Sequence, residues 1–262
     1  MTKFSKYSSN GNDFILIDNR DGKQEVSNTE KWQQLCQRCF GIGADGVVFL
    51  ESSDKYDFHM RYLNADGNEE SMCGNATRAI TDFYRRTTGT KNTDFKFTTG
   101  SGLYSSGIEG DVIWVHMTVI KDADLYDLTN KYEDAQDSYY INTGVEHSVF
   151  MVYDAQEVDV DTVGRRVRFD EDFPRGSNAN FINQIDEGEW RIRTYERGVE
   201  AETFACGTGN VAAACMLWDK EYEHRDEIEF LTNGGILFVK RVDGFIYLGG
   251  QTKLVYTGEF ND

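Results

Sequence analysis

The chain has few basic residues and no long apolar run. Its 262 residues include 27 Lys and Arg against 45 Asp and Glu, which gives a net charge of −18. Binding to a nucleic-acid backbone needs a basic surface, so this charge excludes nucleic acid as a partner. No apolar stretch approaches the length of a membrane span, and residues 1–7 carry no signal-peptide pattern. We therefore expect a cytoplasmic protein that does not associate with membranes.

Cofactor motifs are also missing. The sequence contains no glycine-rich dinucleotide fingerprint, no βαβ alternation and no motif that presents a lysine to a cofactor. The five cysteines are an odd number, which predicts free thiols in a reducing compartment. Cys36 and Cys39 form a lone C-x-x-C without a second pair, and we interpret them as core-facing residues one helical turn apart. We expect neither a cofactor nor a metal.

The hydrophobic pattern predicts many strands and few helices. Apolar and polar residues alternate over residues 58–62 and 190–194, as in half-buried strands. Further predicted strands are Phe14–Asp18, Asp94–Thr98, Val112–Val119, Ser148–Tyr153, Asn180–Gln184, Glu227–Leu231, Ile236–Arg241 and Phe245–Leu248. Predicted helices are Asn28–Cys39, Asn75–Arg86, Ala155–Arg165 and Thr208–Asp219. Glycine-rich turns separate many strands, so we predict an α+β fold with a largely antiparallel sheet.

Two short segments nearly repeat each other. Residues 71–79 read SMCGNATRA and residues 204–212 read FACGTGNVA, so that Cys73 and Cys206 are separated by about half of the chain. The repeat predicts two related halves, with a break near residues 119–138, inside an acidic segment. We expect an N-terminal lobe of residues 1–118, completed by a C-terminal strand at 253–262, and a second lobe of residues 119–252.

The matching context favours a chemical role for Cys73 and Cys206. A free cysteine is most often a small buried hydrophobe. A thiol at the start of a helix, however, lies beside unpaired N–H groups and the positive end of the helix dipole, which favours the thiolate. The same N–H groups, at Gly74-Asn75 and Gly207-Thr208, suit a carboxylate. Two facing thiols suit the removal of a proton from one face of a carbon and its return to the other.

Other polar residues are ambiguous on spacing alone. His147 precedes a strand, Glu196-Arg197 ends one, and the segments at Asn12 and Asn64 resemble turns. On spacing alone, each of them is more typical of a structural role than of a chemical one.

These motifs together closely resemble the diaminopimelate epimerase family, nearly from end to end. The resemblance rests on the segments FSKY (4–7), GNDF (11–14), FGIGADG (40–46), MR (60–61), NADG (64–67), MCGN (72–75), ERG (196–198) and ACGTG (205–209). It implies cofactor-independent interconversion of LL- and meso-diaminopimelate. It also implies two similar lobes, each a mostly antiparallel sheet rolled around a central helix, with the active site in the cleft between them. We expect a homodimer that acts on a small amino-acid substrate.

The resemblance assigns roles to individual residues. It implies that Cys73 and Cys206 are the base and acid pair, assisted by His147 and Glu196. It implies a substrate site that holds the reacting carboxylate and grips the distal amino-acid end. The residues of that site would be Asn12, Asn64, Gly74, Asn75, Asn180, Glu196, Arg197, Gly207 and Thr208.

Several positions depart from the family pattern. Val145-Glu146 stands where many members have Asn-Pro, Ala76 and Ala79 replace a frequent glycine and cysteine, and Cys39 replaces a frequent histidine. These departures bear on substrate preference rather than on the reaction. Amino-acid racemases of the same superfamily, such as histidine and proline racemases, are the alternative, and a thiol-redox or binding protein is a third hypothesis. Exchange of a substrate α-hydrogen with deuterated solvent distinguishes them.

Overall fold

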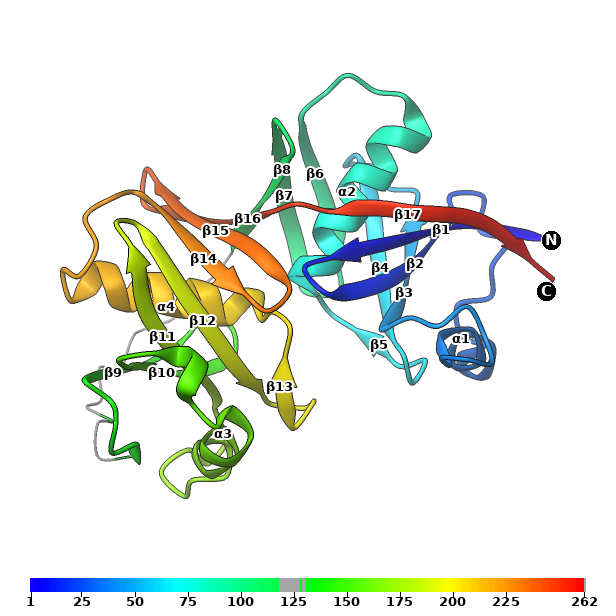
Figure 1. Ribbon diagram of the computed structural model, residues 1–262. Helices are drawn as coiled ribbons and strands as arrows, with labels where there is room; N and C mark the ends of the chain where they lie inside the picture. The colour runs from blue at the N-terminus through cyan, green and yellow to red at the C-terminus, as the bar shows by residue number, and fades with distance from the viewer. Residues whose placement is uncertain (118–127, 129–130, 262) are drawn as a thin grey trace. The chain divides into compact units, whose positions relative to one another are not determined.

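The computed structural model describes residues 1–117, 128 and 131–261 (Figure 1). The chain divides into two compact units. The first unit comprises Met1–His116 with Gly249–Asp262, and the second comprises Met117–Leu248. The predicted break at residues 119–138 and its acidic segment lie largely outside the described residues.

The first unit is a mostly antiparallel sheet with two helices (Figure 1). Its strands pair in the order β17-β1-β2-β3-β4-β6-β7-β8, with β5 beside β4. The pairs β2–β3 and β4–β6 are parallel. The elements are β1 Thr2–Ser9, β2 Asn12–Asp18, α1 Thr29–Cys36, β3 Gly46–Glu51, β4 Phe58–Asn64, β5 Glu69–Glu70, α2 Gly74–Thr88, β6 Asp94–Thr99, β7 Gly102–Glu109, β8 Val112–Met117 and β17 Lys253–Phe260.

Helix α2 carries the core of the first unit. Ala76, Ala79 and Ile80 are fully buried in a cluster that includes Phe14 of β2 and Val48 of β3. Small alanine side chains let the helix approach the strands closely, and burial of the large side chains around them removes apolar surface from water. The start of α2 is thereby held in a fixed position relative to the strand ends that surround it.

The second unit repeats this topology. Its strands pair in the order β9-β10-β11-β12-β14-β15, with β13 beside β12. The pairs β10–β11 and β12–β14 are parallel, in the same places as in the first unit. The elements are β9 Asp137–Asn142, β10 Glu146–Met151, η2 Ala155–Glu157, α3 Val160–Arg168, β11 Asn178–Asp186, β12 Glu189–Glu196, β13 Ala201–Thr203, α4 Gly207–Asp219, β14 Glu227–Thr232, β15 Gly235–Val242 and β16 Phe245–Gly250.

Helix α4 is the counterpart of α2. Its residues from Gly209 to Trp218 are all buried, and those from Val211 onward pack in one cluster with Val149 of β10 and Ile182 of β11. A helix that is apolar on every side lies inside a core rather than on its surface. The two repeated units confirm the predicted α+β fold of two lobes, each a mostly antiparallel sheet with a central helix.

Two local predictions are wrong. The predicted helix Ala155–Arg165 is split into η2 and α3, because Val158 is extended and Asp159 begins a new helix by accepting a hydrogen bond from the Thr162 N–H. Cys39 does not face the core with Cys36. Helix α1 ends at Cys36, and Cys39 is exposed in a left-handed backbone conformation with φ of 70°.

Candidate functional site

One edge of the first unit gathers polar side chains from three neighbouring strands. Asn12 begins β2 and Asp45 directly precedes β3, which runs parallel to β2. Asn64 ends the antiparallel strand β4 and is paired with Gly46 at the start of β3. Within the described part of the chain, the Asn64 side chain makes no hydrogen bond to protein, so its amide is available to a ligand.

The second unit places its polar residues at the equivalent edge. Glu146 and His147 begin β10, and His147 is in register with Asn178 at the start of the parallel strand β11. Glu196 ends β12, which is antiparallel to β11. His147 and Glu196, which are far apart in the sequence, therefore lie at the same edge of the sheet because of the strand order.

Cys73 and Cys206 are the N-cap residues of the two central helices. Both have extended backbone, with φ and ψ of −141° and 120° at Cys73 and −113° and 107° at Cys206. The carbonyl of Cys73 accepts hydrogen bonds from the Thr77 N–H and Oγ1, each at 2.9 Å. The carbonyl of Cys206 accepts in the same way from the Asn210 N–H at 3.1 Å and Nδ2 at 2.7 Å. The two helix starts are thus built alike.

Neither thiol caps its helix, so the first-turn N–H groups are not used by the cysteines. Gly74 and Asn75 follow Cys73, and Gly207 and Thr208 follow Cys206, at the positive ends of the two helix dipoles. Such a position binds anions, carboxylates included. The predicted carboxylate-binding residues are therefore brought next to the predicted thiols in each unit.

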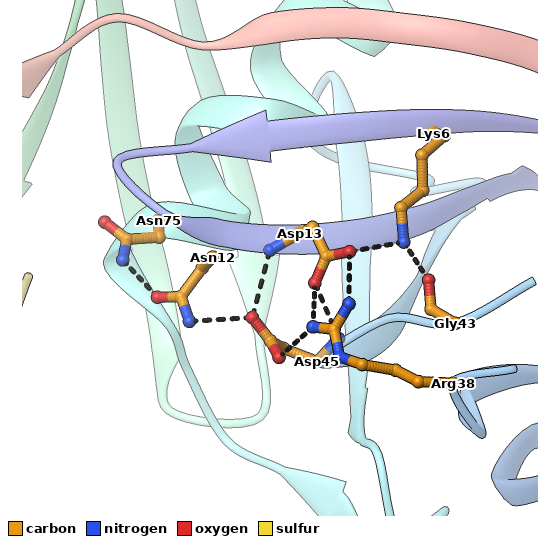
Figure 2. A network of polar contacts seen from close by, with 7 residues as sticks. All are labelled: Lys6, Asn12, Asp13, Arg38, Gly43, Asp45 and Asn75. Atoms are coloured by element: carbon orange, nitrogen blue, oxygen red, sulfur yellow. Dashed lines mark hydrogen bonds and ion pairs between the residues drawn. The ribbon is translucent and has the colours of Figure 1, made fainter. Parts of the chain in front are cut away.

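A chain of hydrogen bonds fixes the amides of the first unit. The Arg78 Nη2 donates to Asn75 Oδ1 at 2.6 Å, Asn75 Nδ2 donates to Asn12 Oδ1, and Asn12 Nδ2 donates to Asp45 Oδ2 at 3.1 Å. Figure 2 shows the part from Asn75 to Asp45. Arginine only donates and a carboxylate only accepts, so the charged ends determine which way both amides point. Each amide keeps one N–H for a ligand.

Arg78 is fully buried behind Cys73. Its side chain has no exposed surface, and its Nε and Nη1 have no hydrogen-bond partner among the described residues. Burial lowers the pKa of Arg78 to about 10, which leaves it cationic at neutral pH, and the electrostatic interaction with Cys73 opposes that shift. A buried cation on α2 thus interacts electrostatically with the first candidate catalytic thiol.

Asp45 is itself held by a cluster of charges (Figure 2). Arg38 Nη2 lies 2.8 Å from Asp45 Oδ1 and 2.6 Å from Asp13 Oδ1, and Lys6 Nζ lies 2.7 Å from Asp13 Oδ2. Burial alone would raise the pKa of Asp13, but the hydrogen bonds from Arg38 and Lys6 lower it below its usual range. The glycine loop of residues 40–46 is thereby fastened to the start of β2.

Glu196 contacts Cys206 in the second unit. Its Oε2 accepts a hydrogen bond from Thr203 Oγ1 at 2.9 Å, and the Cys206 thiol is a further hydrogen-bond partner of the carboxylate. Burial raises the pKa of Glu196 above its usual range, although these two hydrogen bonds oppose the shift. A carboxylate with a raised pKa is a better proton acceptor for a neighbouring thiol. Thr208 Oγ1 lies 3.5 Å from the Cys206 sulfur.

His147 is buried as a neutral imidazole. Burial, followed by the charge of Arg197, lowers its pKa to about 3. Asn180 Nδ2 lies 3.2 Å from His147 Nδ1 and 3.0 Å from the Ser148 carbonyl, and Asn180 Oδ1 accepts from Thr194 Oγ1. Because an amide nitrogen only donates, Nδ1 accepts and the proton is assigned to Nε2. Nε2 is buried and has no partner among the described residues.

Asn180 is therefore occupied by protein contacts rather than open to a ligand. It also touches the start of α4, because a Cβ added to Gly209 would lie 2.3 Å from Asn180 Oδ1. Glycine at this position is what allows the helix start and the Asn180 amide to meet. Asn180 thus connects His147 to the start of α4, the helix whose N-cap residue is Cys206.

Arg197 is placed by Glu146 and Asn178, neither of which the sequence analysis assigned to the site. Its Nη1 lies 2.8 Å from Glu146 Oε2, and its backbone N–H donates to Asn178 Oδ1 at 2.8 Å. In the sequence, the departure from the family's Asn-Pro at Val145-Glu146 was the feature that could have pointed to Glu146. Asn178 shares a face of β11 with Asn180, so the two-residue spacing was the signal for Asn178.

The remaining cysteines differ from Cys73 and Cys206. All five are free. Burial raises the pKa of Cys36 and of Cys215 to about 12, so both remain thiols at neutral pH. Cys39 is exposed. Among the described residues, no group of three or more His, Cys, Asp or Glu side chains is placed to hold a metal ion.

Solved structures share this fold. The chain is similar to a phenazine biosynthesis protein of the PhzF family from Enterococcus faecalis, with a TM-score of 0.77, 13% identity and 99% of each chain covered. It is also similar to a probable proline racemase from Agrobacterium radiobacter, with a TM-score of 0.69, 13% identity, and 100% of this chain and 93% of that chain covered. These likenesses define the class: an α+β protein of two repeated lobes. No helix in the described ranges has the length and hydropathy to cross a bilayer.

Sequence comparisons identify the family within this class. The family model for diaminopimelate epimerase matches residues 4–120 and 139–255. Diaminopimelate epimerase of Flavobacterium psychrophilum is 37% identical, over 97% of this chain and 98% of the relative. That of Methanocella arvoryzae is 37% identical, over 99% and 96%. The chain belongs to the diaminopimelate epimerase family and is an isomerase.

Proposed function

We propose that the protein epimerises LL-diaminopimelate to meso-diaminopimelate without a cofactor, a reaction of lysine and cell-wall precursor biosynthesis. One observation carries the proposal. Each repeated unit places a cysteine, Cys73 or Cys206, at the N-cap of its central helix with the thiol not used for capping. A helix start that favours a thiolate and binds a carboxylate is suited to remove a proton from the carbon between them.

The mechanism uses the two thiols in turn. One, as the thiolate, removes the α-proton, and the pair of electrons left on Cα is delocalised into the carboxylate. The other, as the thiol, donates its proton to the opposite face, so that the two cysteines have exchanged protonation states after one turnover. Helix-start N–H groups aimed at the carboxylate stabilise the charge that develops on it. We assign this carboxylate contact to Gly74, Asn75, Gly207 and Thr208.

Two side chains assist the thiols. Glu196 is hydrogen-bonded to Cys206, and its raised pKa fits transient acceptance of the thiol proton. His147 carries an Nε2–H that has no partner in the described part of the chain, and it is uncharged at neutral pH. A neutral donor of this kind can stabilise a thiolate without becoming a competing acid.

The substrate contacts follow from which side chains remain available. Asn12, Asn64 and Asn75 keep amide groups for the ligand, and Arg197 with Glu196 offers a cation and a carboxylate for the distal amino-acid end. Asn180 holds His147 rather than the substrate in this proposal. The distal group is thus read by charges, which favours a long substrate with two amino-acid ends over a simple amino acid.

The cellular setting is part of the proposal. Five free thiols fit a reducing compartment, so we propose a cytoplasmic enzyme. We further propose that residues 1–118 with 253–262, and residues 119–252, act as two functional lobes, and that the enzyme works as a homodimer. Light scattering of the purified protein measures the last point directly.

Solvent-deuterium exchange tests the reaction. The purified protein is incubated in D₂O with LL-diaminopimelate, histidine, lysine or proline, and loss of the α-proton signal is followed by NMR. We expect rapid exchange with diaminopimelate alone. Cys73→Ala and Cys206→Ala should each lower epimerisation by at least about 100-fold, because general acid–base groups contribute rates of that order. Cys39→Ala is the matched control, with unchanged turnover.

The outcomes separate the alternatives. Near wild-type turnover in either of the first two variants would refute the two-thiol mechanism. Faster exchange with histidine or proline would favour an amino-acid racemase. No exchange with any substrate would favour a thiol-redox or binding protein.

A further inference from the structure

Glu146 is a buried carboxylate placed between two arginines. Its side chain is only 6% exposed. Oε1 lies 2.5 Å from the Nε of Arg175, in the segment between α3 and β11, and Oε2 lies 2.8 Å from Arg197 Nη1. A carboxylate removed from water needs such partners, so the three side chains form one unit rather than a chance surface pair.

Further hydrogen bonds tie these residues together. Arg197 Nη1 also donates to the Arg175 carbonyl at 2.8 Å. Asn178 spans the same group, because its Nδ2 donates to the Glu146 carbonyl and its Oδ1 accepts from the Arg197 N–H, each at 2.8 Å. The backbone and the side chain of Arg197 are therefore both fixed, and the Arg175 backbone is held against it.

The charges in this group do not cancel. Two guanidinium groups face one carboxylate, which leaves one net positive charge. Both oxygens of Glu146 are already engaged, so the group has no free anion for an ammonium ligand. Among the described residues, Arg175 contacts other side chains through its Nε alone, and its side chain is 74% exposed. Its two terminal nitrogens therefore remain available as paired donors, the geometry that suits a carboxylate.

We propose that Arg175 is a second carboxylate-binding residue, which acts with Arg197 on the distal carboxylate of the substrate, and that Glu146 is the positioning residue that holds the two guanidinium groups side by side. This inference rests on the proposed function. Without Glu146 the two cations would repel each other, and with it they present one shared positive charge. Arg175 and Glu146 depend on each other, because each supplies the partner that the other needs.

Steady-state kinetics of the full-length Arg175→Gln variant test the proposal. We expect the KM for diaminopimelate to rise about tenfold, as for loss of one charge-assisted contact, with kcat within twofold of wild type. The inhibition constant of 2-aminopimelate, which keeps the distal carboxylate but lacks the distal ammonium, should rise by the same factor. Arg175→Lys, which keeps the charge but not the paired donors, should lie between. Arg225→Gln, at an exposed ion pair of the same unit, is the matched control.

The role of Glu146 is tested by a double-mutant cycle. Glu146→Gln should also raise the KM, and adding it to Arg175→Gln should cost less than the product of the two separate factors, because the residues act through one contact. An unchanged KM in Arg175→Gln, or a fall in kcat alone, would overturn the inference. If the two substitutions raise the KM by independent factors that multiply, Glu146 is not the residue that positions Arg175. A wild-type protein that does not exchange the α-proton of diaminopimelate would instead refute the proposed function.

Discussion

Acidification from pH 7 to pH 5 should destabilise the second unit through His147. In the folded protein burial, together with the charge of Arg197, lowers the pKa of this imidazole from 6.5 to about 3. Below pH 6.5 the unfolded chain takes up a proton that the folded chain does not, so the free energy of unfolding falls as the pH falls. Above pH 6.5 neither state is protonated and this contribution is constant.

The size of the effect follows from the pKa difference. One pKa unit corresponds to about 1.4 kcal/mol. Because pH 5 is about 1.5 units below the pKa of the unfolded chain, the free energy of unfolding at pH 5 should be lower by about 2 kcal/mol. The loss would reach about 5 kcal/mol near pH 3. That amount is comparable with the whole stability of a marginal domain.

Two measurements check this. NMR of ¹⁵N-histidine-labelled protein should show the His147 imidazole as neutral and protonated at Nε2 at pH 5, with its signal assigned by its loss in His147→Gln. Urea unfolding at pH 7 and pH 5 should give a stability loss about 2 kcal/mol smaller in His147→Gln than in wild type. His224→Gln, at an exposed histidine of the same unit, is the control. An imidazolium signal for His147 at pH 5, or equal losses in wild type and His147→Gln, would refute the reasoning.

Two further substitutions test the packing around the thiols. Asp45→Asn replaces the acceptor of Asn12 and breaks the ion pair with Arg38. It should lower the free energy of unfolding, measured with urea, by about 1–3 kcal/mol and raise the KM severalfold. An unchanged KM would show that the orientation of the amides does not depend on Asp45. Gly209→Ala places a methyl group 2.3 Å from Asn180 Oδ1, so it should cost about 1–3 kcal/mol and lower turnover, and unchanged stability would contradict the close contact.

The helices that carry the thiols were predictable from local signals. A cysteine and glycine before a run of helix-forming residues placed the starts of α2 and α4 within one residue of the observed Gly74 and Gly207. Strand β3 was missed, since its sequence GVVFLE does not alternate. The structure gives the reason: Val48 and Leu50 pack with the buried residues of α2, while Val47 and Phe49 pack with Trp32 and Cys36 of α1. A strand buried on both faces has no polar side to reveal it.

The charged network of the second unit was not predictable in the same way. Glu146, Arg175 and Arg197 are far apart in sequence. The register of β10, β11 and β12 brings Glu146 and Arg197 together, and Arg175 reaches Glu146 from the segment that leads into β11. Asn178 and Asn180 lie two residues apart on one strand face, so the sequence offers no basis for choosing between them. Their roles differ because Asn178 meets Arg197 at the strand edge, whereas Asn180 meets His147 further along.

The repeated units explain which features are shared and which are not. Strand order and helix start are the same in both, so Cys73 and Cys206 each lie at the N-cap of a central helix, as the proposed reaction at a single carbon with two faces requires. The strand edges beside them have diverged. The first unit carries amides held by Arg78 and Asp45, whereas the second carries Glu196, Arg197 and the Glu146 network. In the proposed mechanism, inversion at one carbon uses the helix-start thiols that both units share, assisted by Glu196 and His147 of the second unit. Recognition of a second amino-acid end uses the Arg197 and Glu146 network of the second unit. Substitutions in the network of Glu146, Arg175 and Arg197 should therefore alter KM and substrate choice far more than the chemistry of proton exchange.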